Sequence, residues 1–129
     1  MTPALALAVA LGSGIGAVLR WETDRQHALY RERRGLGRPT FPWATLSVNV
    51  VGSALLGVVA GLVLAGDLDP VWQTVLGTGL AGGLTTFSTL AFDVVELVRE
   101  RRYLRSGAVV LLNVALGLAA AVLGYHLVP

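Results

Sequence analysis

The chain has 129 residues, of which 54% are hydrophobic, and its mean hydropathy is +0.68. This composition is too apolar for a soluble domain of this size and favours a membrane protein. The net charge of +2 at pH 7 rests on ten basic residues, all arginine, that lie beside apolar runs and so favour a membrane over a nucleic-acid partner. The chain has no cysteine, which excludes disulfides and thiolate metal sites.

Four apolar segments follow one another along the chain, and a helix needs about 20 residues to cross ~30 Å of hydrocarbon. They are residues 3–19, 43–64, 71–98 and 107–128. We therefore predict one all-α domain over residues 1–129, with four transmembrane helices, in the plasma or inner membrane of the cell. No basic stretch precedes the first segment, so we expect no cleaved signal peptide.

The first segment, residues 3–19, is short for a membrane span, and we expect it to end at Arg20 before a polar, basic loop over residues 20–42. Gly12 and Gly16 precede Arg20 at intervals of four, so they lie on one helix face and predict close packing. Two interpretations of Arg20 stay open. Its side chain either reaches the membrane interface or forms a vestibule charge that attracts anions.

The second segment carries a primary amide, Asn49, in the middle of an apolar helix. Thr45, Ser53 and Gly57 share its face at intervals of four. Because an unpaired amide is costly in hydrocarbon, Asn49 either bonds to another helix or donates to a solute on its path.

The third segment contains a run of poor helix formers, GGLTTFST at residues 82–89. We predict that the third helix is broken here, because the segment is longer than a span requires. Unwound carbonyls at membrane depth make a ready ion site. Further along, we expect Asp93 and Glu96 to pair with arginines of the neighbouring loops.

The fourth segment repeats the same spacing, with Asn113, Gly117 and Ala121 on one face. Asn113 lies near the predicted start of this helix, where an amide readily finds a helix partner. We therefore expect a packing role for Asn113 and for the small residues that follow it.

The arginines predict the orientation of the spans. All ten lie in the first and third connections: Arg20, Arg25, Arg31, Arg33, Arg34, Arg38, Arg99, Arg101, Arg102 and Arg105. The opposite side, with both termini and the second connection, carries none. The positive-inside rule then predicts that both termini lie outside the cytoplasm.

Four motifs together resemble the Fluc/CrcB family of fluoride channels. They are GSGIGAVLRW at residues 12–21, TLSVNVVG at 45–52, GGLTTFST at 82–89 and LLNV at 111–114. Their order and spacing agree across nearly the whole chain, and the third motif is the most specific. The resemblance implies a fluoride-selective channel that passively exports cytoplasmic fluoride down its electrochemical gradient.

The resemblance also implies an assembly and a bound ion. The family pattern is an antiparallel dimer with two pores and a structural sodium ion at its centre. By resemblance, the backbone carbonyls of Gly82 and Thr85 hold that ion. One set of four small helices has little room for a sealed aqueous path, which also favours a dimer.

The expected fluoride path follows from the same resemblance, with Asn49 and Phe87 lining the pore and Arg20 in its vestibule. Fluoride is strongly hydrated, so its pore must replace water with donors: the Asn49 amide and hydroxyls. An aromatic edge adds positive charge. The remaining expected pore residues are Thr86, Ser88, Thr89 and Leu90.

Two features depart from the family pattern. Leu90 stands where the family usually has a second phenylalanine, and Phe92 lies on another helix face. The ten-to-zero arginine bias fixes one orientation, whereas an antiparallel homodimer is expected to show a weak bias. We therefore hold open both a homodimer and a heterodimer with an inversely oriented paralogue.

Two other functions are weighed against a channel, and no enzyme signature is found in the spans. A small proton-coupled multidrug exporter needs a carboxylate deep in the membrane. The first, second and fourth segments lack one, while Asp93 and Glu96 lie late in the third. The third interpretation is a non-transporting scaffold subunit. Substitution of Asn49 or Phe87 distinguishes it from a channel, because only a channel would lose fluoride flux.

Overall fold

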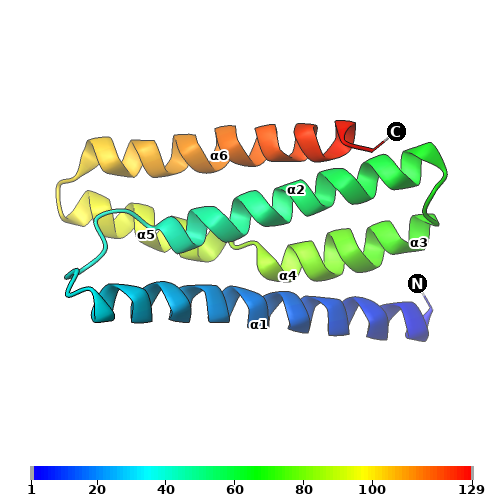
Figure 1. Cartoon of the computed structure of the whole chain (residues 1–129), viewed down its shortest axis with the longest axis horizontal. Coiled ribbons are helices and arrows are strands. Elements are labelled where there is room, and N and C mark those ends of the chain that lie inside the picture. Colours follow the sequence, from blue (N-terminus) through cyan, green and yellow to red (C-terminus); the bar gives the residue numbers. More distant parts are fainter. Residues whose placement is uncertain (1, 129) are drawn as a thin grey trace.

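The computed structural model describes residues 2–128, and within them the only regular elements are helices (Figure 1). They are α1 (Pro3–Arg33), α2 (Trp43–Ala65), α3 (Pro70–Trp72), the π-helix η1 (Gln73–Ala81), α4 (Gly82–Leu84), α5 (Phe87–Arg99) and α6 (Tyr103–His126). Four helical stretches are long and apolar enough to cross a membrane, with α3 to α5 forming the third. The predicted all-α fold is confirmed, and the chain is a multi-pass membrane protein.

The first helix is longer than predicted. α1 continues through residues 20–33, so the prediction that it ends at Arg20 is wrong. This stretch has no glycine or proline, and its polar side chains pair along the helix, as Arg25 does with Glu22 at 3.1 Å. Gly35, with a φ of 62°, follows the helix in the left-handed conformation.

The third span is interrupted at its centre, as predicted. α4 ends at Leu84 and α5 begins at Phe87. Between them, Thr85 (φ −73°, ψ 157°) and Thr86 (φ −147°, ψ 122°) have extended backbone. Figure 1 shows the two half-helices joined by this short link. The break frees backbone groups at membrane depth, and these must find partners on other helices.

Small residues bring the helices into backbone contact on two sides of the bundle. α1 packs on η1 and α4, and α2 packs on α6. A Cβ on Gly83 would lie 2.8 Å from Ser13 Cα, and one on Gly57 would lie 2.8 Å from the carbonyl carbon of Ala121. The stripes of small residues are therefore packing surfaces.

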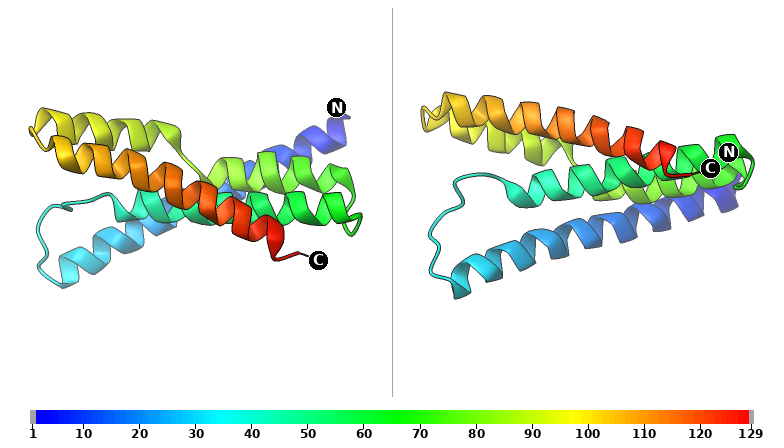
Figure 2. Two further views of the ribbon diagram at one scale, coloured as in Figure 1. Left: turned by 90° about the horizontal axis from the view of Figure 1, so that it is seen from above. Right: turned by 45° about the horizontal axis from the view of Figure 1, so that its top comes forward.

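The ends of the helices alternate as predicted (Figure 1). The N-terminal end of α1 and the C-terminal end of α6 lie at the same end of the bundle as the α2–α3 turn, and the 34–42 and 100–102 connections lie at the other end. In both views of Figure 2, the C-terminal end of α1 and the α5–α6 turn lie apart. A cavity of about 760 Å³ opens at this end between α1, the 34–42 connection, α2 and α5.

Candidate functional site

The break is closed by the side chain of Asn49, which reaches across from α2. Its Oδ1 accepts the Thr86 N–H at 2.8 Å, and its Nδ2 donates to the Thr86 carbonyl at 3.2 Å. One side chain thus pairs with both polar groups of a single unwound residue. In a continuous helix the Thr86 N–H would bond to the Gly82 carbonyl. Here it turns to Asn49 instead.

Asn49 also connects the break to α6. Its Nδ2 donates to Asn113 Oδ1 at 2.9 Å, while Asn113 Nδ2 donates to the Val109 carbonyl within its own helix. Asn113 is buried, and its predicted packing role is confirmed. Both hydrogens of the Asn49 amide form hydrogen bonds within the protein, so Asn49 supports the backbone of the break. Direct donation to fluoride stays a prediction.

Hydroxyl groups gather where α5 begins. The Thr86 hydroxyl accepts the Thr89 N–H at 3.2 Å and so caps the helix. The same hydroxyl donates to Thr89 Oγ1 at 3.0 Å and lies 3.3 Å from Ser88 Oγ. The structure therefore brings together the hydroxyls of three predicted pore residues at the positive end of a helix dipole.

Arg20 also contacts the break, from α1 rather than from α2. It lies in the middle of α1, and its Nη1 donates to the Thr85 carbonyl at 2.9 Å. The side chain is half-buried and points to the third span rather than to the interface. Among residues 2–128, no carboxylate lies within ion-pair distance of it.

The remaining predicted site residues line an open groove of about 400 Å³ beside the break. They are Gly82, Thr85, Phe87 and Leu90, together with Asn49 and Thr86. Phe87 is 82% exposed, although it lies at the centre of a membrane span. Thr89 lines the cavity at the 34–42 end instead, so the hydroxyl cluster lies between the groove and that cavity.

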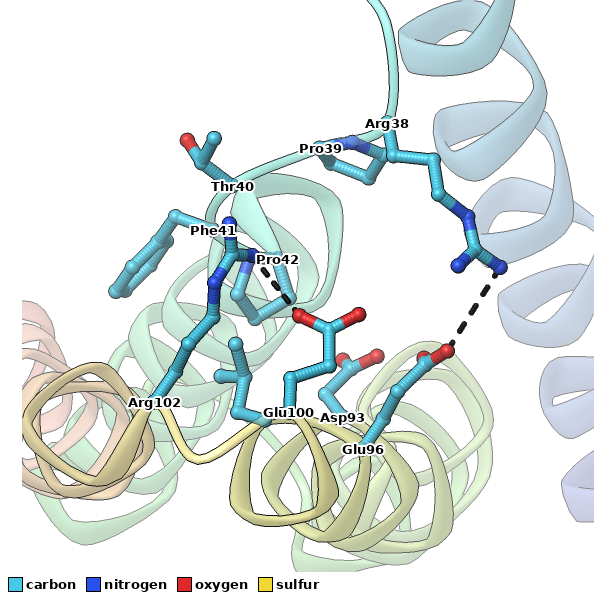
Figure 3. A pocket seen from close by; sticks show the side chains of 10 residues that line it. Arg38, Pro39, Thr40, Phe41, Pro42, Asp93, Glu96, Glu100 and Arg102 are labelled. Atoms are coloured by element: carbon cyan, nitrogen blue, oxygen red, sulfur yellow. Dashed lines mark ion pairs between the residues drawn. The ribbon is translucent and has the colours of Figure 1, made fainter.

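The carboxylates near the third connection differ in their partners (Figure 3). Glu96 lies 3.8 Å from Arg38, as predicted, and Glu100 lies 3.0 Å from Arg102. Asp93 forms no such ion pair among the described residues, so the prediction that it pairs with an arginine is wrong. Its Oδ2 accepts the Thr45 hydroxyl at 2.8 Å.

Sequence reasoning noted Thr45 only as part of a stripe. It is buried on α2, one turn before Asn49 and on the same face. A buried hydroxyl and a carboxylate that both face the inside of a membrane bundle must find partners. The need of both groups for a hydrogen-bond partner is the feature of the sequence from which the Thr45–Asp93 bond could have been predicted.

Residues 7–125 of this chain match the family model "CrcB-like protein, Camphor Resistance (CrcB)". This chain belongs to the CrcB family. Similar relatives include "Fluoride-specific ion channel FluC 1" of Leifsonia xyli subsp. xyli, which is 44% identical over 80% of this chain and 71% of the relative. "Fluoride-specific ion channel FluC 2" of Mycobacterium tuberculosis is 44% identical over 96% and 90% of the two chains.

A third relative matches this chain over almost its full length. "Fluoride-specific ion channel FluC" of Thermococcus kodakarensis is 38% identical over 95% of this chain and 94% of the relative. The match over residues 7–125 includes all four motifs noted in the sequence and the whole of the break. The groove, the hydrogen bonds between Asn49 and Thr86, and the hydroxyl cluster are therefore features of a CrcB chain.

Proposed function

We propose that this CrcB protein is a fluoride-selective anion channel. Its relatives are named fluoride-specific ion channels, and that is the class of protein this chain resembles over nearly its whole length. The proposal rests chiefly on the break in the third span. Asn49 holds the backbone of Thr86 there by two hydrogen bonds, and hydroxyl groups gather beside it at the start of α5. Among the described residues, no carboxylate lines the groove at the break, where a proton-coupled exporter would need one.

The chemistry of the hydroxyl cluster suits a small anion. Ser88 and Thr89 carry O–H donors that can replace water around fluoride, and the N-terminus of α5 adds a positive partial charge. Phe87 would present the positive edge of its ring from the groove. We propose that fluoride passes between the groove and the cavity at the 34–42 end, by way of this cluster.

We propose that the channel is an antiparallel dimer. Phe87 is 82% exposed beside an open groove at membrane depth, and a second subunit would cover both. Polar groups around the break would otherwise face lipid, where they find no partners. The dimer axis would then pass near the break, and each subunit would complete the other's path.

The carbonyls expected to hold a structural sodium ion fit that role by their donor chemistry. The Gly82 carbonyl loses its helical donor because the Thr86 N–H bonds to Asn49. The Thr85 carbonyl accepts one hydrogen bond, from Arg20, and a carbonyl oxygen has two lone pairs. A sodium ion bound there would supply positive charge that offsets the dipoles of the same carbonyls from two subunits.

Passive export follows from the charge of the ion. Neutral hydrogen fluoride enters the cell from an acidic medium and dissociates inside. We propose that the membrane potential then drives fluoride out through the channel, since moving one elementary charge across 100 mV is equivalent to about 2.3 kcal/mol. Such a mechanism requires no ATP site.

We further propose that the partner is an inversely oriented paralogue. The nine arginines other than Arg20 all lie toward the end of the bundle that holds the 34–42 and 100–102 connections, which fixes one orientation. Leu90 lines the groove where the family pattern has a second aromatic ring. A partner with both rings and the opposite arginine bias would complete the path.

Fluoride efflux from proteoliposomes tests these proposals, with chloride efflux as the control. If the chain alone releases fluoride, the channel proposal holds and the paralogue proposal is wrong. If release requires a second CrcB chain from the same genome, both proposals hold. If neither preparation releases fluoride faster than chloride, the channel proposal is wrong.

A further inference from the structure

The break frees two successive carbonyls, and each is covered by a donor from a different helix. Arg20 of α1 donates to the Thr85 carbonyl at 2.9 Å, and Asn49 of α2 donates to the Thr86 carbonyl at 3.2 Å. Bare carbonyls at membrane depth attract cations and repel anions. Covering them is therefore a condition for an anion to pass beside the break.

Arg20 does more than satisfy a carbonyl, because it also brings a full positive charge. It has no carboxylate partner among residues 2–128. Charged side chains inside a membrane span are expensive, and one without a counter-ion is a functional candidate by default. Charge-assisted hydrogen bonds are also about twice as strong as neutral ones.

The packing of α1 fixes where this charge lies. One turn before Arg20, a Cβ on Gly16 would lie 2.6 Å from the Leu84 N atom, so α1 runs directly against the backbone of α4. This contact brings the stretch of α1 around Arg20 beside the end of α4. Arg20 therefore reaches the carbonyl that directly follows α4.

We propose that Arg20 is a positioning residue that holds the Thr85 carbonyl and gives the break a positive electrostatic potential. This role rests on the proposed passage of fluoride beside the break. It differs from that of a vestibule charge, which attracts anions through water and weakens as salt screens it. A contact between a half-buried guanidinium and a carbonyl is screened much less.

The sequence allows the contact to be observed at a single site. Thr85 and Thr86 are the only adjacent pair of threonines in the chain. In protein labelled with threonine that carries carbonyl ¹³C and ¹⁵N, the one-bond ¹³C–¹⁵N correlation therefore reports only the Thr85 carbonyl. Solid-state NMR of the full chain in bilayers measures this signal without any need for transport.

The labelled protein is compared as wild type, Arg20→Lys, Arg20→Met and Arg25→Gln. Arg25→Gln is the matched control because Arg25 lies on the same helix, pairs with Glu22 and is remote from the break. We expect the Thr85 carbonyl signal to move upfield or broaden in Arg20→Met. It should stay in place in Arg25→Gln, and Arg20→Lys should restore part of the shift. An unchanged signal in Arg20→Met overturns the proposal.

A transport measurement then tests the role of the contact. In the assembly that conducts for wild type, we expect Arg20→Met to slow fluoride efflux about tenfold or more, the equivalent of one lost charge-assisted hydrogen bond. The loss should be similar at about 0.01 M and about 1 M ionic strength, where the Debye lengths are ~30 Å and ~3 Å. Arg20→Lys should recover part of the rate.

The outcomes separate this inference from the channel proposal. A loss that disappears at high salt assigns Arg20 to a vestibule and overturns the positioning role. Equal efflux in wild type and Arg20→Met also overturns it, while the channel proposal stands. Absence of fluoride-selective efflux in wild type overturns the channel proposal, and the NMR result still decides the contact.

Discussion

The side chain of Asn49 pairs with the backbone of Thr86 in the way one strand pairs with another. Its Oδ1 accepts the Thr86 N–H at 2.8 Å, and its Nδ2 donates to the Thr86 carbonyl at 3.2 Å. A broken helix in a membrane is stable only if its freed backbone groups are satisfied inside the protein. The single amide of Asn49 pairs with two of these backbone groups, the N–H and the carbonyl of Thr86. The break therefore has one fixed conformation.

Asn49→Ala should destabilise the protein by about 2–5 kcal/mol, since it leaves the N–H and carbonyl of Thr86 without partners. Asn49→Asp should also destabilise it, because a carboxylate accepts from the N–H but faces the carbonyl with a second acceptor. Thermal unfolding in detergent measures both. Ser47→Ala is the control, because the Ser47 hydroxyl bonds only to the Ala44 carbonyl within its own helix. Equal unfolding temperatures for Asn49→Ala and Ser47→Ala would show that the hydrogen bonds between Asn49 and Thr86 do not stabilise the break.

Gly16→Ala should disrupt the packing of α1 on the third span. The added Cβ would lie 2.6 Å from the Leu84 N atom, and backbone atoms on both helices must shift to admit it. We expect a loss of about 1–3 kcal/mol, as for other overpacked sites. Gly14→Ala is the matched control, since nothing lies within 4 Å of its Cβ. A protein that tolerates both changes equally would show that the close approach is absent.

Phe87→Ile should abolish most fluoride efflux without unfolding the subunit. Phe87 is 82% exposed, so its ring contributes little to packing within one chain. Its loss would remove the aromatic edge from the proposed path. Phe92→Ile is the control, because Phe92 is also exposed but does not line the groove. Efflux assays and size-exclusion profiles of both variants separate transport from assembly, and full transport by Phe87→Ile would remove this residue from the path.

Leu90→Phe should increase fluoride efflux from the chain reconstituted alone. Leu90 lines the groove three residues after Phe87, where a second ring would share the same helix face. The change adds the aromatic contact that the family resemblance leads us to expect. Efflux at equal protein density compares the variant with wild type. An unchanged or lower rate would show that the second ring is not what limits this chain.

The features predicted correctly from sequence are those set by local chemistry. Paired glycines and threonines at residues 82–89 are poor helix formers, and the third span breaks at Thr85 and Thr86. Asn49 was expected to bond across helices or to face a solute, and the structure shows bonds to the break and to Asn113. Hydrocarbon allows few alternatives for an amide, which is why the pattern was informative.

The features that sequence did not predict depend on distant partners. The polarity of residues 20–33 suggested a loop, but the stretch has good helix formers and no breaker, so α1 continues outward from the apolar segment. Arg20 was placed at a helix end for the same reason. Its contact with Thr85 depends on how α1 packs against α4, and no local pattern encodes that register. The Thr45–Asp93 bond likewise joins two helices.

We propose that anions cross this membrane protein beside the break of the third span, where Asn49 holds the backbone of Thr86. The most direct test is voltage-driven efflux from proteoliposomes, with fluoride and chloride measured for wild type and Asn49→Ala in the assembly that conducts. We expect rapid release of fluoride but not chloride by wild type, and loss of most of that release in Asn49→Ala. Equal fluoride release by the two proteins, or no selective release by wild type in any assembly, would contradict this proposal.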